Sequence, residues 1–279
     1  MNDLTHYLNL ALQAARGAGD IINDMRFSPV SRSKADGTIV TDADTAAETY
    51  IRDFFSKNAP RIPVWGEEFG REAQGADYEW IIDPIDGTTW YEMGSPVFGT
   101  LIGLLREGEP VVGVIALPAT NEIVFAAQGG GCFYSNPRFS DPRRVRVSSD
   151  PGSLSNARVS SAGLHRTDIW LEKGPKPYAL SRLPTSAKLF RLAGDCLQHA
   201  LVARGNLHAA IDTAMHPWDT AAIVPCIQEA GGYLCGIEGQ TTDIVGCGSL
   251  LSACSPQLLD ELVNILAPGS STFKTDAIQ

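Results

Sequence analysis

The sequence predicts a protein of mixed α and β structure, with an α+β half followed by an α/β half. Short strand-like runs separated by Gly and Pro turns fill the first half, and alternating strand and helix patterns fill the second. A polar, Pro-containing stretch at residues 135–149 separates the two patterns. Because 279 residues exceed one ordinary core, we expect two subdomains, residues 1–145 and residues 146–279.

The first half is expected to be an antiparallel sheet with helices on one face. Apolar residues recur at helical intervals in residues 4–25 and 45–57, so both segments are predicted to be amphipathic helices. The runs that follow them resemble a series of hairpins. The predicted strands are residues 63–66, 79–83, 97–106, 110–117, 122–127 and 131–134.

The second half is expected to contain mixed or parallel strands, because strand and helix patterns alternate there. The predicted strands are residues 157–161, 207–211 and 232–235, and the predicted helices are residues 165–172, 195–204, 219–230 and 256–266. The tail that starts at Pro268 is polar and is expected to fray.

The most informative stretch is residues 80–91, which read Trp-Ile-Ile-Asp-Pro-Ile-Asp-Gly-Thr-Thr-Trp-Tyr. An apolar run ends in Asp83, and Pro84 stiffens the following corner so that Asp83 and Asp86 can converge on one point. Gly87 permits a sharp bend, after which backbone amides are placed to bind an anion. Carboxylates beside such a turn suit Mg²⁺ bound to phosphate, although an Asp-Pro surface turn with a helix cap explains the same residues.

Two further segments place acidic residues after short apolar runs. Glu67 and Glu68 follow Gly66, and Asp219 stands at the predicted start of a helix. Taken singly, the glutamates could be solvated loop charges and Asp219 could be a helix cap that contributes about 1 kcal/mol. The motifs therefore carry more information together than separately.

The combined pattern resembles the inositol monophosphatase family of magnesium-dependent phosphomonoesterases over about residues 4–266. Four ordered motifs carry the resemblance: Val40-Thr41-Asp42-Ala43-Asp44, Gly66-Glu67-Glu68, Asp83 to Thr88, and Trp218-Asp219-Thr220-Ala221-Ala222. The resemblance implies a five-layer α-β-α-β-α sandwich with the active site in the crevice between the halves. A homodimer is the expectation that follows from the family.

The resemblance also implies roles for individual residues. Glu67, Asp83 and the carbonyl of Ile85 would hold one Mg²⁺, and Asp83, Asp86 and Asp219 would hold a second. Asp44, Thr88 and Glu67 are the expected catalytic residues, with Asp44 and Thr88 orienting and deprotonating the attacking water and Asp44 touching a weaker third ion. Thr88 and the amides of Gly87 and Thr89 would cradle the phosphate, and Lys34 corresponds to a lysine near the metals.

Elementary electrostatics agrees with a site that holds cations. Four carboxylates about 4 Å apart would repel one another by roughly 4 kcal/mol per pair at an effective dielectric constant of about 20. Without cations, the site should therefore be poorly ordered or partly protonated. Two divalent ions would offset the charge, activate a water and stabilise the leaving alkoxide, so neither a Ser-His-Asp nor a Cys-His arrangement is needed.

Composition narrows the classes of partner. A net charge of −10 argues against nucleic acid, whose phosphates require a basic surface. The sequence contains neither an apolar run of membrane-spanning length nor an N-terminal leader pattern, so we expect a cytoplasmic protein that does not insert into membranes. Six cysteines without a Cys-x-x-Cys pair are expected to be mostly buried, reduced thiols. Among the five histidines, His216 is the one expected to lie near the site.

The substrate is predicted less sharply than the chemistry. Residues 66–70, 98–102 and 194–196 resemble the histidinol-phosphatase branch. Asp195 and Asp212 correspond to substrate-contacting positions, and two acids would attract the ammonium group of L-histidinol phosphate. Inositol monophosphate or another sugar or aminosugar phosphate is the alternative, and a non-catalytic regulatory role in protein binding is the alternative from another class.

One departure from the family bears on the pocket. Relatives usually carry Thr-Asn-Phe or Lys-x-Phe after the Asp-Gly-Thr motif, whereas this chain has Thr89-Trp90-Tyr91. A bulky indole there is expected to change the packing of the helix or to narrow the mouth of the pocket.

Overall fold

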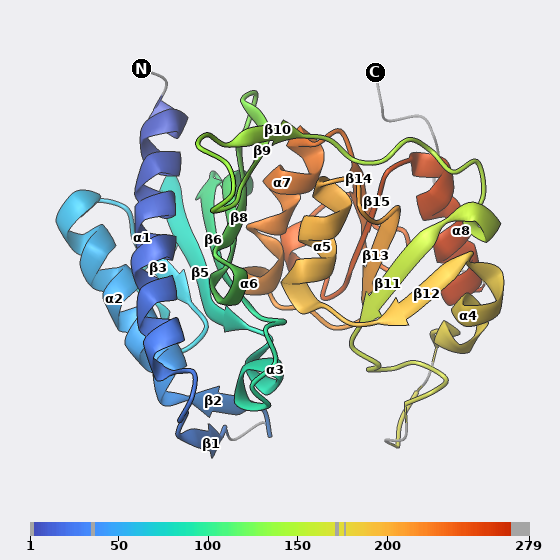
Figure 1. Cartoon of the computed structure of the whole chain (residues 1–279), viewed down its shortest axis with the longest axis horizontal. Coiled ribbons are helices and arrows are strands. Elements are labelled where there is room, and N and C mark those ends of the chain that lie inside the picture. Colours follow the sequence, from blue (N-terminus) through green and yellow to red (C-terminus); the bar gives the residue numbers. More distant parts are fainter. Residues whose placement is uncertain (1–2, 35–36, 171–172, 176, 269–279) are drawn as a thin grey trace.

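The protein folds as five layers of helices and sheets. The structure, a computed structural model, describes residues 3–34, 37–170, 173–175 and 177–268. Helices α1 (Asp3–Met25) and α2 (Asp42–Asn58) form one outer layer, and α4 (Leu183–Ser186) and α8 (Pro256–Leu266) form the other. Two sheets enclose a middle layer that contains α5 (Asp195–Ala203) and α7 (Ile223–Glu229). Figure 1 shows these layers side by side, which confirms the predicted α-β-α-β-α sandwich.

The first sheet has eight strands in the order β10-β9-β8-β7-β6-β5-β3-β4. All neighbouring pairs are antiparallel except β3 and β5, which run parallel. The strands are β3 (Val64–Gly66), β4 (Gly70–Arg71), β5 (Tyr78–Asp86), β6 (Gly99–Arg106), β7 (Glu109–Leu117), β8 (Glu122–Ala127), β9 (Gly131–Ser135) and β10 (Arg143–Val145). A separate hairpin consists of β1 (Ser31–Ser33) and β2 (Ile39–Thr41), and the short helix α3 (Thr88–Glu92) follows β5.

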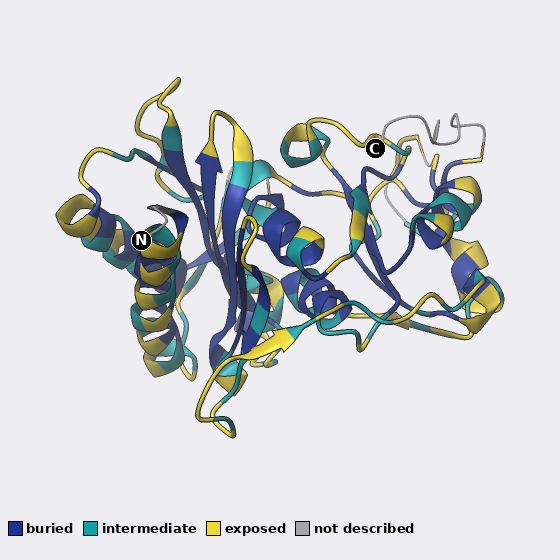
Figure 2. Ribbon diagram, turned by 90° about the horizontal axis from the view of Figure 1, so that it is seen from above, coloured by how far each residue is buried: buried dark blue, intermediate teal, exposed yellow. Residues whose placement is uncertain are grey.

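Helix α1 forms because its small and branched apolar residues recur on one face. Ala11, Ala18 and Ile22 are completely buried against the first sheet, whereas the opposite face is exposed, as Figure 2 shows. Helix α2 begins with a capping box in which Thr41 and Asp44 satisfy each other's backbone N–H groups. The two predicted helices of the first half are therefore confirmed.

The second sheet has five strands in the order β12-β11-β13-β15-β14, with parallel pairs around β11 and antiparallel pairs around β15. The predicted mixture of strand directions is confirmed. The strands are β11 (Arg158–Ala162), β12 (Leu189–Leu192), β13 (Ala209–Asp212), β14 (Tyr233–Cys235) and β15 (Leu250–Ala253). Helix α6 (Pro217–Thr220) precedes α7, and single 3₁₀ turns lie at Pro118–Thr120, Leu154–Asn156, Leu180–Arg182 and Ile244–Gly246.

Two helix predictions in this half were wrong. Residues 165–170 form turns and one isolated bridge, because Arg166 has a φ of 60°, which a right-handed helix excludes; residues 171–172 lie outside the described residues. The single helix expected over residues 219–230 is two helices, α6 and α7. Pro225 lies in the first turn of α7, where a missing N–H is tolerated, but in one helix starting at residue 219 it could not donate to the carbonyl of Ala221.

The middle layer approaches the first sheet closely. A Cβ atom on Gly113 of β7 would lie 2.1 Å from the carbonyl oxygen of Ala222, so only glycine allows the chain leading into α7 to pack there. The division of the chain at residue 145 stays a prediction. Five of the six cysteines are buried and all six are free thiols, as expected. None of the described helices combines the length and apolarity needed to cross a bilayer.

Candidate metal and phosphate site

The turn after β5 brings two aspartates to one side of the first sheet. The pairing with β6 shifts register between Asp83 and Asp86, so that these residues do not alternate across the pleat as they would in a regular strand. Gly87 then adopts a φ of 87°, and helix α3 begins at Thr88. The convergence and the glycine bend predicted from the sequence are therefore confirmed.

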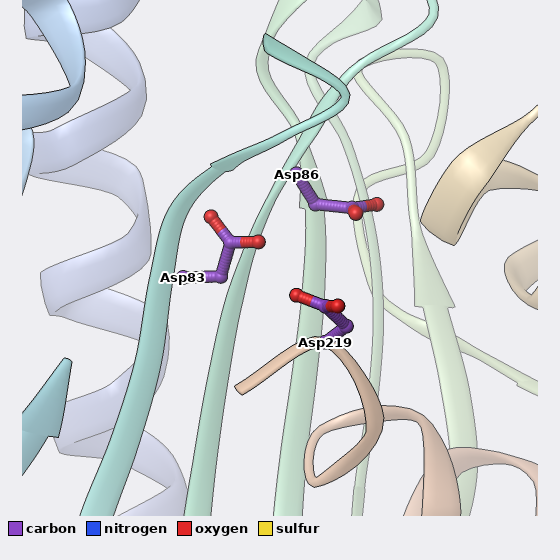
Figure 3. A group of neighbouring side chains, drawn as sticks. All are labelled: Asp83, Asp86 and Asp219. Atoms are coloured by element: carbon purple, nitrogen blue, oxygen red, sulfur yellow. The ribbon is translucent and has the colours of Figure 1, made fainter. Parts of the chain in front are cut away.

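A third aspartate meets this pair from the second half of the chain. One carboxylate oxygen from each of Asp83, Asp86 and Asp219 lies within 4.8 Å of the others, and Figure 3 shows the three side chains pointing toward a common centre. Asp219 is held at the start of α6 because its Oδ2 accepts the N–H of His216 at 2.7 Å. Asp86 accepts the N–H of Cys196 at the start of α5, which ties the cluster to the middle layer.

Burial and mutual repulsion raise the pKa values of all three carboxyls. Burial raises the pKa of Asp83 well above its usual range, and the charges of Glu67, Asp86 and Asp219 add to it. Burial, followed by the charge of Asp219, raises the pKa of Asp86 to about 7. Burial likewise raises the pKa of Asp219 to about 7, against the hydrogen bond from His216. These shifts agree with the partial protonation expected of an acidic site without cations.

The cluster fits a hard cation. Asp83 Oδ1 is buried and has no hydrogen-bond partner among the described residues. An all-oxygen donor set of this kind suits Mg²⁺ or Ca²⁺ rather than softer metals.

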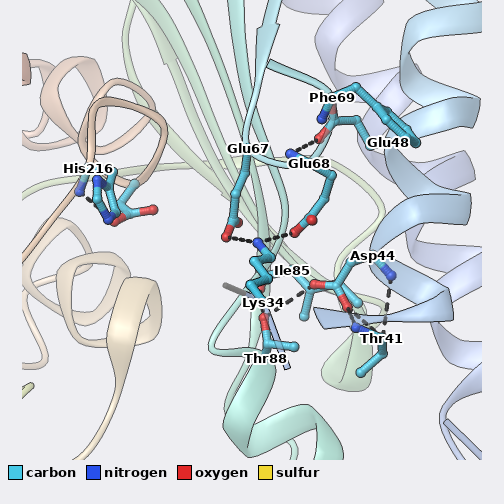
Figure 4. Close-up of polar contacts among 11 residues, drawn as sticks. Lys34, Thr41, Asp44, Glu48, Glu67, Glu68, Phe69, Ile85, Thr88 and His216 are labelled. Carbon is cyan, nitrogen blue, oxygen red and sulfur yellow. Dashed lines mark hydrogen bonds and ion pairs between the residues drawn. The ribbon is translucent and has the colours of Figure 1, made fainter. Parts of the chain in front are cut away.

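Glu67 lies beside the cluster but is engaged elsewhere. Its Oε1 is 2.7 Å from Nζ of Lys34, which also contacts Oε1 of Glu68 at 2.7 Å, as Figure 4 shows. Burial lowers the pKa of Lys34, but the hydrogen bonds and charges of the two glutamates outweigh burial and raise it overall. The turn carrying both glutamates requires Gly66, because a Cβ there would lie 2.1 Å from the carboxylate of Glu48.

Asp44 and Thr88 form the pair that the resemblance implies. Thr88 Oγ1 lies 3.2 Å from Asp44 Oδ1 and donates to the carbonyl of Ile85 at 2.9 Å. The other carboxylate oxygen of Asp44 accepts the N–H and the hydroxyl of Thr41. Burial raises the pKa of Asp44 to about 6 although the bonds from Thr41 lower it. Figure 4 shows these contacts converging at the start of α2.

The predicted site residues surround a cleft of about 430 Å³ between the two sheets. Most line it directly: Glu67, Asp83, Ile85, Asp86, Gly87, Thr88, Thr89, Asp195 and Asp219. Asp44 and Asp212 are buried and do not line it. Asp44 lies behind Thr88, and the predicted roles of both aspartates stay predictions.

Aromatic residues form much of the remaining wall. The cleft is also lined by Trp90, His165, His216 and Trp218, and the rings of His216 and Trp218 stack at a centroid distance of 4.8 Å. The expectation that His216 lies near the site is confirmed. The sequence analysis did not identify His165 or the segment 37–39 that also lines the cleft, and neither lies in a motif that could have indicated it.

Asp195 stands on the side of the cleft that belongs to the second half. It begins α5 with a φ of 38°, and its Oδ2 would lie 2.8 Å from a Cβ atom on Gly87. Burial, followed by the charge of Asp86, raises the pKa of Asp195 to about 7. Burial and the charge of Asp195 also raise the pKa of Asp212.

Comparison with known proteins agrees with this geometry. The model of the inositol monophosphatase family matches residues 3–268. A histidinol-phosphatase of Chlorobaculum parvum is 37% identical over 257 residues, which cover 90% of this chain and 93% of that protein.

Solved structures show the same fold. The extragenic suppressor protein suhB of Bartonella henselae matches with a TM-score of 0.82 and 26% identity, covering 95% of this chain and 99% of that one. An IMPase/NADP phosphatase complexed with Mg²⁺ and phosphate matches with a TM-score of 0.81 and 18% identity, covering 98% and 100%. The chain therefore belongs to the inositol monophosphatase family and is a phosphoric monoester hydrolase.

Proposed function

We propose that this chain hydrolyses L-histidinol phosphate with the help of two or three Mg²⁺ ions. The observation that carries the proposal is the convergence of Asp83, Asp86 and Asp219 in a cleft that also contains the carboxylate of Asp195. The histidinol-phosphatase of Chlorobaculum parvum, at 37% identity, supports the choice of substrate.

The ions would be held by carboxylates from both halves of the chain. Asp83, Asp86 and Asp219 would hold one ion, and Asp83 with Glu67 and the carbonyl of Ile85 would hold another. The orphaned Oδ1 of Asp83 supports this assignment, because a buried carboxylate oxygen without a donor gains most from a cation. When bound, Mg²⁺ supplies positive charge for the phosphate and lowers the pKa of a water molecule.

The chain itself orients the attacking water. Thr88 Oγ1, placed between Asp44 Oδ1 and the carbonyl of Ile85, would take a proton from this water while its own hydroxyl proton passes to Asp44. The water oxygen bonds to phosphorus as the ester P–O bond breaks. The leaving alkoxide takes a proton from a solvent water, and Asp44 returns its proton to solvent. The amides at the start of α3, from Gly87 to Thr89, would bind the phosphate oxygens.

A carboxylate on the leaving-group side supports an amine-bearing alcohol. Asp195 lines the cleft beside Gly87, and a negative charge there attracts an ammonium group. The stacked rings of His216 and Trp218 offer an apolar surface on which an imidazole could lie.

A phosphate-release assay tests the proposal directly. We expect the purified protein with Mg²⁺ to hydrolyse L-histidinol phosphate with a higher kcat/KM than inositol 1-phosphate or a sugar phosphate, and chelation of Mg²⁺ to abolish turnover. A higher kcat/KM for inositol 1-phosphate would reject the proposed substrate but not the chemistry. The homodimer expected from the family stays a prediction that light scattering of the purified protein can test.

A further inference from the structure

A buried glutamate on α2 holds the turn of residues 67–69 between β3 and β4. Glu48 is completely buried and does not line the cleft. Its Oε2 accepts the N–H of Glu68 at 2.8 Å, and its Oε1 accepts the N–H of Phe69 at 3.1 Å, as Figure 4 shows. The N–H of Glu67 donates to the carbonyl of Ile82 on β5 at 3.2 Å. Three consecutive amides of the turn are therefore fixed, two of them by one side chain.

The residues around Glu48 are suited to this contact. Gly66 has no side chain in the space that the carboxylate occupies, since a Cβ atom there would lie 2.1 Å from Glu48 Oε1. Arg52, one helical turn further along α2, donates from Nε to the same oxygen at 2.8 Å and from Nη2 to the carbonyl of Gly70. Two amides and one guanidinium thus offset the cost of burying the carboxylate, and the turn is held at both ends.

Glu48 shares one face of α2 with Asp44. The two residues are four positions apart and both are completely buried. Such residues lie on the same side of a helix, about 6 Å apart along its axis. Asp44 lies 3.2 Å from Thr88 Oγ1, whereas Glu48 binds the turn that begins with Glu67. Helix α2 therefore connects two parts of the proposed site at a spacing that the helix itself sets.

We propose that Glu48 is a positioning residue that fixes the turn of residues 67–69, holds Glu67 beside the three aspartates and thereby determines how tightly the site binds Mg²⁺. The inference rests on the proposed function, because Glu67 is proposed there to be a ligand of the ion. Glu48 acts without touching an ion or a substrate, since both of its oxygens accept bonds from protein donors. Without these bonds, ordering the turn would cost part of the free energy of metal binding.

Two substitutions of Glu48 separate positioning from charge. Glu48→Gln keeps the length of the side chain but replaces one oxygen by an NH₂ group, which cannot accept a backbone N–H. Glu48→Asp keeps the charge but is one methylene shorter, so its carboxylate should no longer reach both amides. We expect each change to raise the dissociation constant for Mg²⁺ about tenfold or more, measured by isothermal titration without substrate. At saturating Mg²⁺, kcat should stay within about twofold of the wild-type value, because only the binding of the ion is weakened.

Glu229→Gln is the matched control. Glu229 on α7 also accepts two backbone N–H groups of a turn, those of Gly129 and Gly131, at 2.7 Å each. Neither Glu229 nor these glycines line the cleft, so this change should leave the dissociation constant for Mg²⁺ unaltered. Glu67→Gln should weaken Mg²⁺ binding, and in that background Glu48→Gln should have no further effect, because Glu48 acts through Glu67.

Several outcomes would overturn the inference. Wild-type Mg²⁺ affinity in both Glu48 variants would do so, as would additive losses in the double variant. A loss in Glu48→Gln that Glu48→Asp does not share would assign the effect to charge instead of positioning. If Glu48→Gln did not fold, as judged by circular dichroism, the Mg²⁺ affinity of Glu48→Asp would decide.

The Glu67→Gln variant separates this inference from the proposed function. Unaltered Mg²⁺ affinity in Glu67→Gln would reject the proposed ligand role of Glu67, and the inference with it. Weaker binding in Glu67→Gln together with wild-type affinity in both Glu48 variants would reject the inference alone.

Discussion

Two sets of acidic residues at the site differ in whether protein groups donate hydrogen bonds to their carboxylate oxygens. Asp44 accepts hydrogen bonds from the N–H and the hydroxyl of Thr41 and lies 3.2 Å from Thr88 Oγ1. The cluster of Asp83, Asp86 and Asp219 crowds three carboxylates within 4.8 Å and leaves Asp83 Oδ1 without a partner among the described residues. A carboxylate with protein donors stabilises the fold, whereas a crowded set depends on a cation from solution.

The largest effect is expected from Asp86→Asn. Turnover should fall by more than about 100-fold. Loss of a residue that only orients a metal ligand costs about 10–100-fold, and Asp86 is proposed to bind the ion directly. The metal-free variant should nevertheless unfold at a higher temperature than the metal-free wild type, because one repelling charge is gone. Phosphate release and thermal unfolding in chelator measure the two effects; near-normal turnover would reject Asp86 as a ligand.

Asp44→Asn tests the hydrogen-bonded carboxylate, in contrast with the cluster of Asp83, Asp86 and Asp219. The amide cannot accept a proton from water, so we expect kcat to fall about 10²–10⁴-fold. Unlike Asp86→Asn, this change should leave the unfolding temperature of the metal-free protein nearly unchanged, because the lost charge-assisted bonds from Thr41 offset the removal of a buried charge. Stabilisation of the metal-free protein by Asp44→Asn would contradict the comparison.

The stability of the metal-free protein should fall as the pH rises. The pKa values of Asp86 and Asp219 are about 7 in the folded protein, whereas an unfolded carboxyl titrates near about 4. The folded state therefore holds more protons between about pH 4 and 7, and the free energy of unfolding decreases through this window. Each kcal/mol lost from the free energy of unfolding lowers Tm by about 2–4 °C.

Calorimetry in chelator between pH 5 and pH 8 checks this dependence. Saturating Mg²⁺ should remove most of the decrease in Tm, because the ion replaces the protons. A Tm that rises over this range in the metal-free protein would show that ionisation of the three aspartates does not destabilise the folded state.

The smallest effect is expected from Lys34→Gln. The ammonium of Lys34 contacts Glu67 and competes with a metal for this carboxylate. Its removal should tighten Mg²⁺ binding only a few-fold, because partly exposed ion pairs contribute about 0.2–1 kcal/mol. Isothermal titration with Mg²⁺ measures the change, with Lys57→Gln at the end of α2 as a charge-matched control; weaker binding in Lys34→Gln would contradict the competition.

The residues whose roles follow from local chemistry could be predicted from the sequence. Asp83, Pro84 and Gly87 belong to one turn, and the shapes that proline and glycine impose are local properties. Helix α1 was predictable for the same reason, since its pattern extends over six turns. The meeting of Asp219 with this turn depended on the resemblance, because no local pattern encodes a contact between distant segments.

The misses arose where long-range contacts decide the structure. Strand β15 is four residues long and exists because β13 and β14 pair with it on either side. Strand β12 is mostly exposed and lacks an alternating pattern, so only its pairing with β11 identifies it.

The shared middle layer has a consequence for how the molecule comes apart. Helices α5 and α7 each touch both sheets, so neither sheet can lose its partner without exposing an apolar face to water. The chain should accordingly melt as one cooperative unit despite its two sheets. A thermogram with two resolved peaks would mean that the two halves of the chain unfold independently.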